Sequence, residues 1–185
     1  MTEENNLSHF AENFAQWYRY IALEAPRIVY KSHEQLEKVL PGFEQLKLKE
    51  KGDSRQLEVS CRIAEKTQDY QMKQLSDGQR QLIILYILLE ALRAGVISTL
   101  FIDEPDNFVS LREIQPWLDE LRDVCEEEGR QAIIISHHPE IINSMARGEE
   151  LWFSREEGAH VVVKPLQATE GGLTPAEIVA RGWEK

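Results

Sequence analysis

Two adjacent carboxylates, Asp103 and Glu104, directly follow the apolar segment Thr99–Ile102. Such a segment is typical of a buried β-strand, and open α/β sheets bind their ligands at the C-terminal ends of their strands. One carboxylate in that place can hold Mg²⁺ on nucleotide phosphates, while its neighbour polarises a water molecule for attack. An acidic pair also follows many ordinary strands in a turn, so the pair alone marks only a candidate site.

A second candidate lies in Leu75–Arg80, just before a long apolar segment. Ser76 and Gly78 would stand at the N-terminus of the following helix, where the helix dipole and the backbone N–H groups favour anions. Glycine lets a phosphate approach the backbone closely, because it has no Cβ atom. The structural alternative is a serine that caps the helix beside a turn glycine.

The third candidate is His137, which follows the apolar segment Ile133–Ile135 and Ser136. An imidazole at the exit of a buried strand can hydrogen-bond a terminal phosphate or the attacking water molecule. A lone histidine in such a place is more often structural. Its interpretation therefore depends on the other two candidates.

The three segments occur in a fixed order, and each resembles a motif of ABC-type ATPase heads. Leu75–Gln79 resembles the signature loop, Leu100–Pro105 a Walker B strand with its catalytic glutamate, and Ser136–Pro139 the switch region. The resemblance is to the ABC-like AAA ATPases of bacteria, a group similar to SMC and RecF heads and to overcoming-lysogenization-defect proteins. It covers at least residues 74–139, and residues 178–183 are similar to that group's C-terminal end, less specifically.

This resemblance implies sites for ATP and Mg²⁺ that two heads share. Asp103 orders Mg²⁺, Glu104 acts as the general base, and His137 senses the γ-phosphate. The signature residues bind the nucleotide held by the opposite head, namely Ser76, Asp77, Gly78 and Gln79. Asp106 and Asn107 occupy the place of a loop that bridges the two sites, but they depart from the small residues usual there.

A phosphate-binding P-loop is the element that the resemblance requires and the sequence lacks. A P-loop ends in glycine, lysine and then serine or threonine, and none of the ten glycines here precedes a lysine. We therefore expect the chain to be the C-terminal half of a head, either as a fragment or as one part of a split ATPase. A P-loop half or partner chain would complete it, in a homo- or heterodimer of heads. Alone, we expect it to hydrolyse no ATP.

Two other functions remain open from the residues. The chain can be a non-hydrolysing interaction or regulatory module that docks on a complete ATPase. It can also be a metal-dependent hydrolase that uses carboxylate and imidazole ligands, since mixed ligands of this kind suit several transition metals. Those ligands would be Asp103, Glu104, His137 and His138, but this scheme leaves the segment Ser76–Arg80 without a role.

Composition limits the partners and the compartment. The formal net charge of −11 argues against broad nucleic-acid binding by this chain alone, so we expect nucleic acid only through a full assembly. No apolar run approaches the roughly 20 residues of a membrane span. The polar, acidic start is not typical of a secretory signal. Cys61 and Cys125 lie in apolar patterns, which favours buried free thiols and a cytoplasmic location.

The elements around these residues predict an α/β fold, and the resemblance implies that it is part of a P-loop NTPase head of the ABC type. Its core is a parallel sheet with flanking helices, because buried strands alternate with helical segments after residue 75. We expect one domain, 1–185, in four segments. Residues 1–42 are helical, 43–73 antiparallel strands, 74–150 the signature, Walker B and switch core, and 151–185 a hairpin and a terminal helix.

Four features of this pattern make detailed predictions. Apolar residues at three- and four-residue steps predict a first helix that already includes Leu7 and Phe10, and Pro26 opens a second helix. The continuous apolar runs 96–102 and 132–135 predict strands that are covered on both faces. Thr174, Pro175 and Glu177 form a capping-box pattern, which predicts the start of a final helix.

Overall fold

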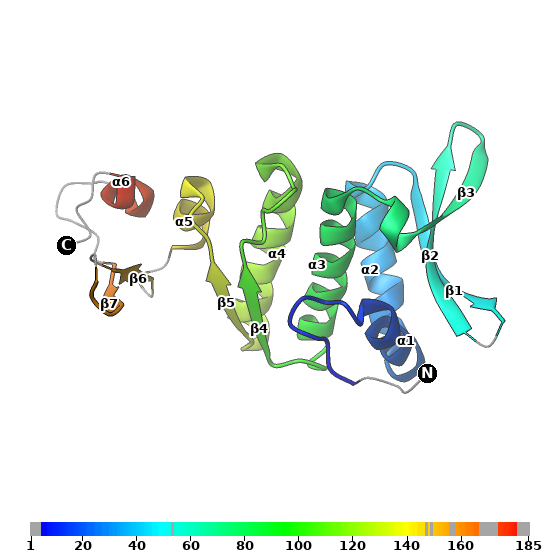
Figure 1. Cartoon of the computed structure of the whole chain (residues 1–185), viewed down its shortest axis with the longest axis horizontal. Helices are drawn as coiled ribbons and strands as arrows, with labels where there is room; N and C mark the ends of the chain where they lie inside the picture. Colours follow the sequence, from blue (N-terminus) through cyan, green and yellow to red (C-terminus); the bar gives the residue numbers. More distant parts are fainter. Residues whose placement is uncertain are drawn as a thin grey trace. The chain divides into compact units, whose positions relative to one another are not determined.

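The computed structural model describes residues 5–52, 54–146, 148, 150–155, 158–166 and 174–180 of the chain. The chain forms two compact units, Met1–Ile133 and Ile134–Lys185. The architecture is mixed α/β, as the sequence predicts, with helices, antiparallel strands and a parallel pair of strands (Figure 1). None of the described helices combines the length and the apolar character that a bilayer crossing requires.

The first unit begins with helices α1 (Phe14–Glu24) and α2 (Pro26–Val39), which pack against each other. The predicted helical start at Leu7 is wrong, because residues 5–13 form turns and α1 begins at Phe14. Ala11 has a φ of 54°, a left-handed conformation that no α-helix contains, and the side chain of Phe10 is 76% exposed. Pro26 opens α2 as predicted.

A three-stranded antiparallel sheet follows, in the order β1 (Phe43–Lys51), β2 (Ser54–Ile63) and β3 (Lys66–Gln71). The predicted antiparallel pair is confirmed, whereas β3 has no apolar alternation and escaped prediction. Gly42 starts the sheet with a φ of 78°, and a Cβ atom there would lie 2.4 Å from the carbonyl oxygen of Arg62. Only glycine fits this close turn between the end of α2 and the start of β1.

The core of this unit is built on helix α3 (Asp77–Arg93), which packs against α2 on one side and α4 (Leu111–Glu128) on the other. The indole N–H of Trp117 in α4 donates a 2.9 Å hydrogen bond to the carbonyl of Leu85 in α3. Each fully buried leucine or isoleucine contributes about 1.5–3 kcal/mol. α3 and α4 end at Gly95 and Gly129, and both glycines have a left-handed φ. The 3₁₀ turn η1 (Met72–Gln74) connects β3 to α3.

Strands β4 (Thr99–Asp103) and β5 (Gln131–Ile135) are neighbours in a two-stranded parallel sheet. The prediction that both faces of these strands are covered is wrong. β4 contacts α3, and Leu100 is buried, but the side chain of Phe101 is 70% exposed and that of Ile133 is 39% exposed. Side chains alternate between the two faces of a strand, so the helices cover one face and leave the other open.

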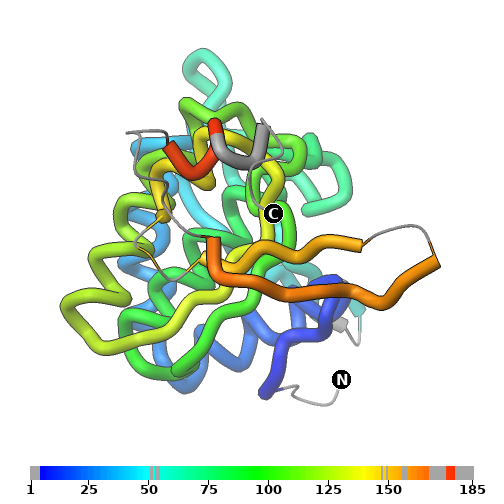
Figure 2. The backbone as a smooth tube through the Cα atoms, turned by 90° about the vertical axis from the view of Figure 1, so that its left-hand side faces the viewer, coloured from blue at the N-terminus to red at the C-terminus, as the bar shows by residue number. Residues whose placement is uncertain are grey.

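The second unit contains α5 (Pro139–Met145), the strands β6 (Leu151–Ser154) and β7 (Val162–Pro165), and α6 (Pro175–Ala180). The predicted hairpin is confirmed as an antiparallel pair (Figure 2). Thr174 and Glu177 form the predicted capping box, since the Thr174 N–H donates to Glu177 at 2.9 Å. The Glu156–Glu157 part of the hairpin turn and residues 181–183 lie outside the described residues.

The two cysteines, Cys61 and Cys125, are free thiols, as predicted. They are half-buried rather than buried, and desolvation raises the pKa of both thiols. Because the thiolate is the reactive form, this environment keeps both residues unreactive near neutral pH.

Candidate functional site

The carboxylate pair lies where the sequence predicts, at the C-terminal end of β4. Asp103 is the last residue of the strand and is exposed, and Glu104 follows it half-buried. Glu104 has a φ of 49°, a left-handed backbone that costs a residue with a side chain about 1–3 kcal/mol. The Glu104 carbonyl accepts a 3.0 Å hydrogen bond from the Asn107 N–H, which closes a turn behind the pair. A strained conformation of this kind favours a functional role over an ordinary turn.

Strained backbone recurs once more within residues 104–109, which we call the carboxylate loop. Phe108 is a second residue with left-handed backbone, with a φ of 67°, and its ring is 75% exposed. The Val109 N–H donates to the carbonyl of Asp106 at 3.1 Å, and the Val109 side chain is buried. The loop is therefore held at both ends. Phe108 was not among the residues predicted from the sequence; an aromatic residue directly after Asp106 and Asn107 was the signal that could have identified it.

The signature segment caps the N-terminus of α3 through a reciprocal pair of hydrogen bonds. The Ser76 hydroxyl accepts from the Gln79 N–H at 3.2 Å, and the Gln79 amide oxygen accepts from the Ser76 N–H at 3.0 Å. Asp77 pairs with Arg80 one turn along the helix. Ser76, Asp77 and Gln79 are exposed. The capping serine expected as the structural alternative is thus present, on a helix N-terminus that can also attract an anion.

Gly78 connects the signature segment to the carboxylate loop. A Cβ atom on Gly78 would lie only 2.4 Å from the carbonyl oxygen of Phe108, closer than any van der Waals contact allows. The first turn of α3 and the loop after Glu104 are therefore in direct backbone contact. The resemblance implies that the signature residues serve the opposite head, and it gives no sign of this contact through Gly78.

His137 lies in the second unit, two residues after β5, and is exposed. Next to it, the Ser136 hydroxyl accepts from the His138 N–H at 3.0 Å. The Nδ1 atom of His138 accepts from the Glu140 N–H at 3.2 Å and so caps α5. Because His137 and the carboxylates belong to different units, their predicted meeting stays a prediction.

The donor set fits Mg²⁺ on a nucleotide better than a metal held by protein alone. Mg²⁺ in phosphate-transfer sites is bound by one or two carboxylates together with phosphates and water, which an exposed Asp103 beside Glu104 can supply. A catalytic transition metal usually takes three protein ligands. Among the described residues, no group of three or more His, Cys, Asp or Glu side chains could hold a metal.

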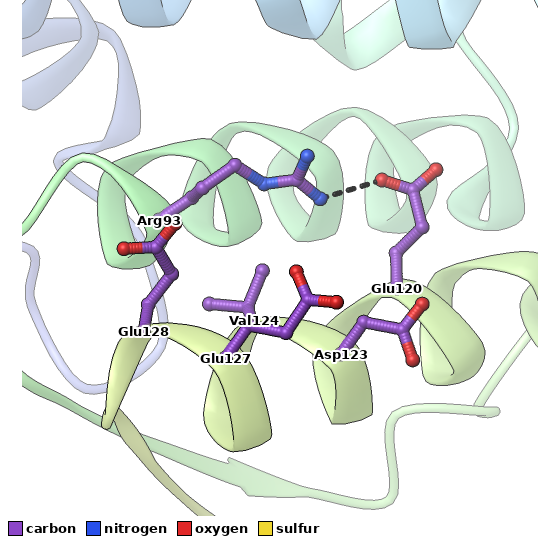
Figure 3. A pocket seen from close by; sticks show the side chains of 6 residues that line it. All are labelled: Arg93, Glu120, Asp123, Val124, Glu127 and Glu128. Atoms are coloured by element: carbon purple, nitrogen blue, oxygen red, sulfur yellow. Dashed lines mark hydrogen bonds and ion pairs between the residues drawn. The ribbon is translucent and has the colours of Figure 1, made fainter.

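A hollow of about 290 Å³ lies elsewhere, between the end of α3 and α4 (Figure 3). It is lined by one guanidinium, one aliphatic side chain and four carboxylates: Arg93, Val124, Glu120, Asp123, Glu127 and Glu128. The Arg93 guanidinium donates to Glu120 at 2.8 Å. Because carboxylates outnumber cations four to one here, the hollow repels phosphates and is not a nucleotide site.

Comparison with known proteins bears on the fold and the family. A family model described as "AAA domain, putative AbiEii toxin, Type IV TA system" matches residues 4–143, which is most of the chain. Among curated protein sequences, none matches.

Several solved SMC structures are similar in fold. One, described as "Structural biochemistry of ATP-driven dimerization and DNA stimulated activation of SMC ATPases", has a TM-score of 0.61 and 17% identity, over 90% of this chain and 94% of that one. The Smc head with coiled coil and joint from Pyrococcus yayanosii has a TM-score of 0.65 and 19% identity, over 95% of this chain and 33% of that one.

The Pyrococcus furiosus Smc head with an extended coiled coil, bound to the C-terminal domain of ScpA, has a TM-score of 0.59 and 17% identity. The match covers 95% of this chain and 42% of that one. The chain thus spans less than half the length of the two Pyrococcus heads. These likenesses establish the SMC-head fold.

Proposed function

The chain belongs to the AAA-domain family that this model describes, and we propose that it is the C-terminal part of an ABC-like ATPase head whose sites a P-loop half completes. The observation that carries the proposal is the open face of the β4–β5 sheet. Part of this face is formed by β4, which ends at Asp103 and is directly followed by Glu104. An exposed apolar face of this kind favours a partner that covers it, and in our proposal this partner lies beside the strand that carries the catalytic carboxylates.

The exposed side chains on that face give the partner something to bury. Phe101 is 70% exposed and Ile133 39% exposed, although strands of a complete parallel sheet are usually covered on both faces. Burying apolar surface stabilises a complex by about 25 cal/mol for each Å² removed from water. We assign this face to the P-loop half, because the head lacks that element and its P-loop would need to lie near the carboxylates.

In the completed head, each motif would have one task. When bound, ATP supplies the phosphoanhydride bond that is cleaved, and Mg²⁺ neutralises the negative charge of its phosphates. Asp103 would hold the metal, Glu104 would take the proton of the attacking water, and His137 would hydrogen-bond the terminal phosphate. The strained backbone of Glu104 supports this role, since such conformations cluster at functional sites.

The signature residues would serve the opposite head. Ser76, Asp77, Gly78 and Gln79 lie at the N-terminus of a helix of 17 residues, whose dipole favours a phosphate brought by a second head. Two heads would then close on ATP. ATP-driven dimerization and DNA-stimulated activation are described for the SMC ATPases of one similar structure. We propose the same ATP-dependent pairing here, in the cytoplasm, with nucleic acid bound only by the full assembly.

Reconstitution with the P-loop half tests the proposal. The completed complex should hydrolyse ATP, and Glu104→Gln should lower the rate by about 10²–10⁴-fold, because the amide cannot accept the proton of water. ATP affinity should be kept, since the amide has the size of the carboxylate. The matched control is Glu127→Gln on α4, a carboxylate in the acidic hollow that should leave the rate unchanged.

Two outcomes would contradict this assignment. Hydrolysis by Glu104→Gln at the parental rate removes Glu104 from the reaction. Stable pairing with the P-loop half but no hydrolysis by the parental complex would instead make the chain a docking or regulatory module.

A further inference from the structure

The contact between Gly78 and Phe108 joins two segments that the proposed function places in different sites. The carboxylates serve the nucleotide of their own head, and the signature residues serve the nucleotide of the opposite head. In the structure, the carbonyl oxygen of Phe108 lies only 2.4 Å from the point where a Cβ atom on Gly78 would stand. The two segments are therefore packed backbone to backbone, without a flexible side chain between them.

Packing within this chain requires glycine at position 78, whether or not a nucleotide is bound. Its backbone is helical, and in a helix alanine is normally more stable than glycine by about 1 kcal/mol. Here the added Cβ would meet the Phe108 oxygen at 2.4 Å and the Val109 Cγ2 atom at 3.9 Å. The first neighbour is backbone, so it can withdraw only if the carboxylate loop moves.

The conformation of Phe108 directs that carbonyl toward α3. A φ of 67° is unfavourable for a residue with a side chain, yet the Phe108 ring is 75% exposed and gains little from burial. On one side, the backbone of Phe108 contacts Gly78. On the other side, its neighbours Asn107 and Val109 make the hydrogen bonds of the turn that begins at Glu104. The strained residue thus lies between the signature helix and the catalytic carboxylate.

We propose that Phe108 is a positioning residue that locks the first turn of α3 to the carboxylate loop, so that the signature segment and the carboxylates move as one body. Closure of the opposite head on the signature would then shift the carboxylates of this head as well. The consequence for hydrolysis depends on the proposed function, whereas the lock itself is a property of the chain alone.

Hydrogen exchange of the full chain, without nucleotide or partner, tests the lock. Gly78→Ala should speed the exchange of amides in residues 104–109 by about tenfold, equivalent to about 1.4 kcal/mol of local opening. Phe108→Val should conversely speed exchange at residues 76–80, because a β-branched residue resists a left-handed φ. Phe108→Gly keeps that conformation without strain and should leave residues 76–80 protected.

Gly52→Ala is the matched control, because Gly52 also has a left-handed φ of 60° but a Cβ atom there would meet nothing within 4 Å. It should destabilise the β1–β2 turn and leave residues 104–109 unchanged. Unaltered exchange of 104–109 in Gly78→Ala would overturn the lock.

In the completed ATPase, Phe108→Val should lower kcat while the affinity for ATP is retained. Phe108→Gly should instead have a kcat close to that of the parental complex. A normal kcat in Phe108→Val would overturn the catalytic consequence. If the parental complex hydrolyses nothing, the proposed function fails while the exchange result still decides the lock.

Discussion

Helix α3 and strand β4 are neighbours in the first unit, yet one is enclosed and the other is half open. α3 is apolar almost all round, and α2 and α4 cover it. β4 is equally apolar, but it carries a 70% exposed Phe101. The difference shows that the helical core is enclosed within this chain, whereas one face of the β4–β5 sheet is exposed. We therefore expect the helical core to set the stability of this chain, while the proposed function assigns the exposed face of the sheet to a P-loop half.

The largest effect on stability should come from Trp117→Ala in the helical core. The indole is fully buried and donates to the Leu85 carbonyl, so truncation leaves a cavity between α3 and α4 and removes this hydrogen bond. We expect a loss of about 3–5 kcal/mol in the free energy of unfolding, measured by urea denaturation. A loss below about 1 kcal/mol would mean that the helical core does not hold the chain together.

A smaller effect should follow acidification, through His33 between the helices and the first sheet. Burial lowers the pKa of His33 to about 4, and its Nε2 atom accepts a 3.2 Å hydrogen bond from the Leu46 N–H. The unfolded chain binds this proton near its ordinary pKa of about 6.5. Stability from His33 is therefore complete above pH 6.5 and is lost as the pH falls toward 4.

At pH 5 we expect His33 to account for a loss of about 1–2 kcal/mol relative to pH 7, after allowing for its partial exposure. Urea midpoints at the two pH values measure the loss, and His33→Gln should reduce the pH difference by that amount. An unchanged difference in His33→Gln would assign the acid sensitivity to other groups.

The smallest effect on the lone chain should come from Phe101→Ser on the open face of β4. Because the ring is already mostly in water, the free energy of unfolding should change by no more than about 0.5 kcal/mol. Association with the P-loop half should weaken by at least about tenfold, measured by calorimetry, because the ring loses its buried contact there. Equal affinity of Phe101→Ser and of the parental chain for the P-loop half would show that this partner covers another surface.

Much of the local structure could be read from the sequence because short-range interactions decide it. Pro26 opens α2, and the Ser76 and Gln79 side chains cap α3. Left-handed glycines end the helices at Gly95 and Gly129. Each signal acts within about one helical turn, so the residues that cause a boundary lie beside it in the chain. The carboxylates at the end of β4 were predictable for the same reason.

The remaining features were decided by contacts between residues far apart in the sequence. β3 forms because β2 offers it a hydrogen-bonding edge, although its own residues lack a strand pattern. The apolar pattern predicted that both faces of β4 are covered, whereas the packing of the chain leaves one face exposed. The sequence likewise marked Gly78 as a glycine, but only the tertiary structure brings the Phe108 carbonyl, 30 residues later in the chain, against it. A pattern records how apolar or small a residue is, whereas the neighbour that requires this property is chosen by the packing of the whole chain.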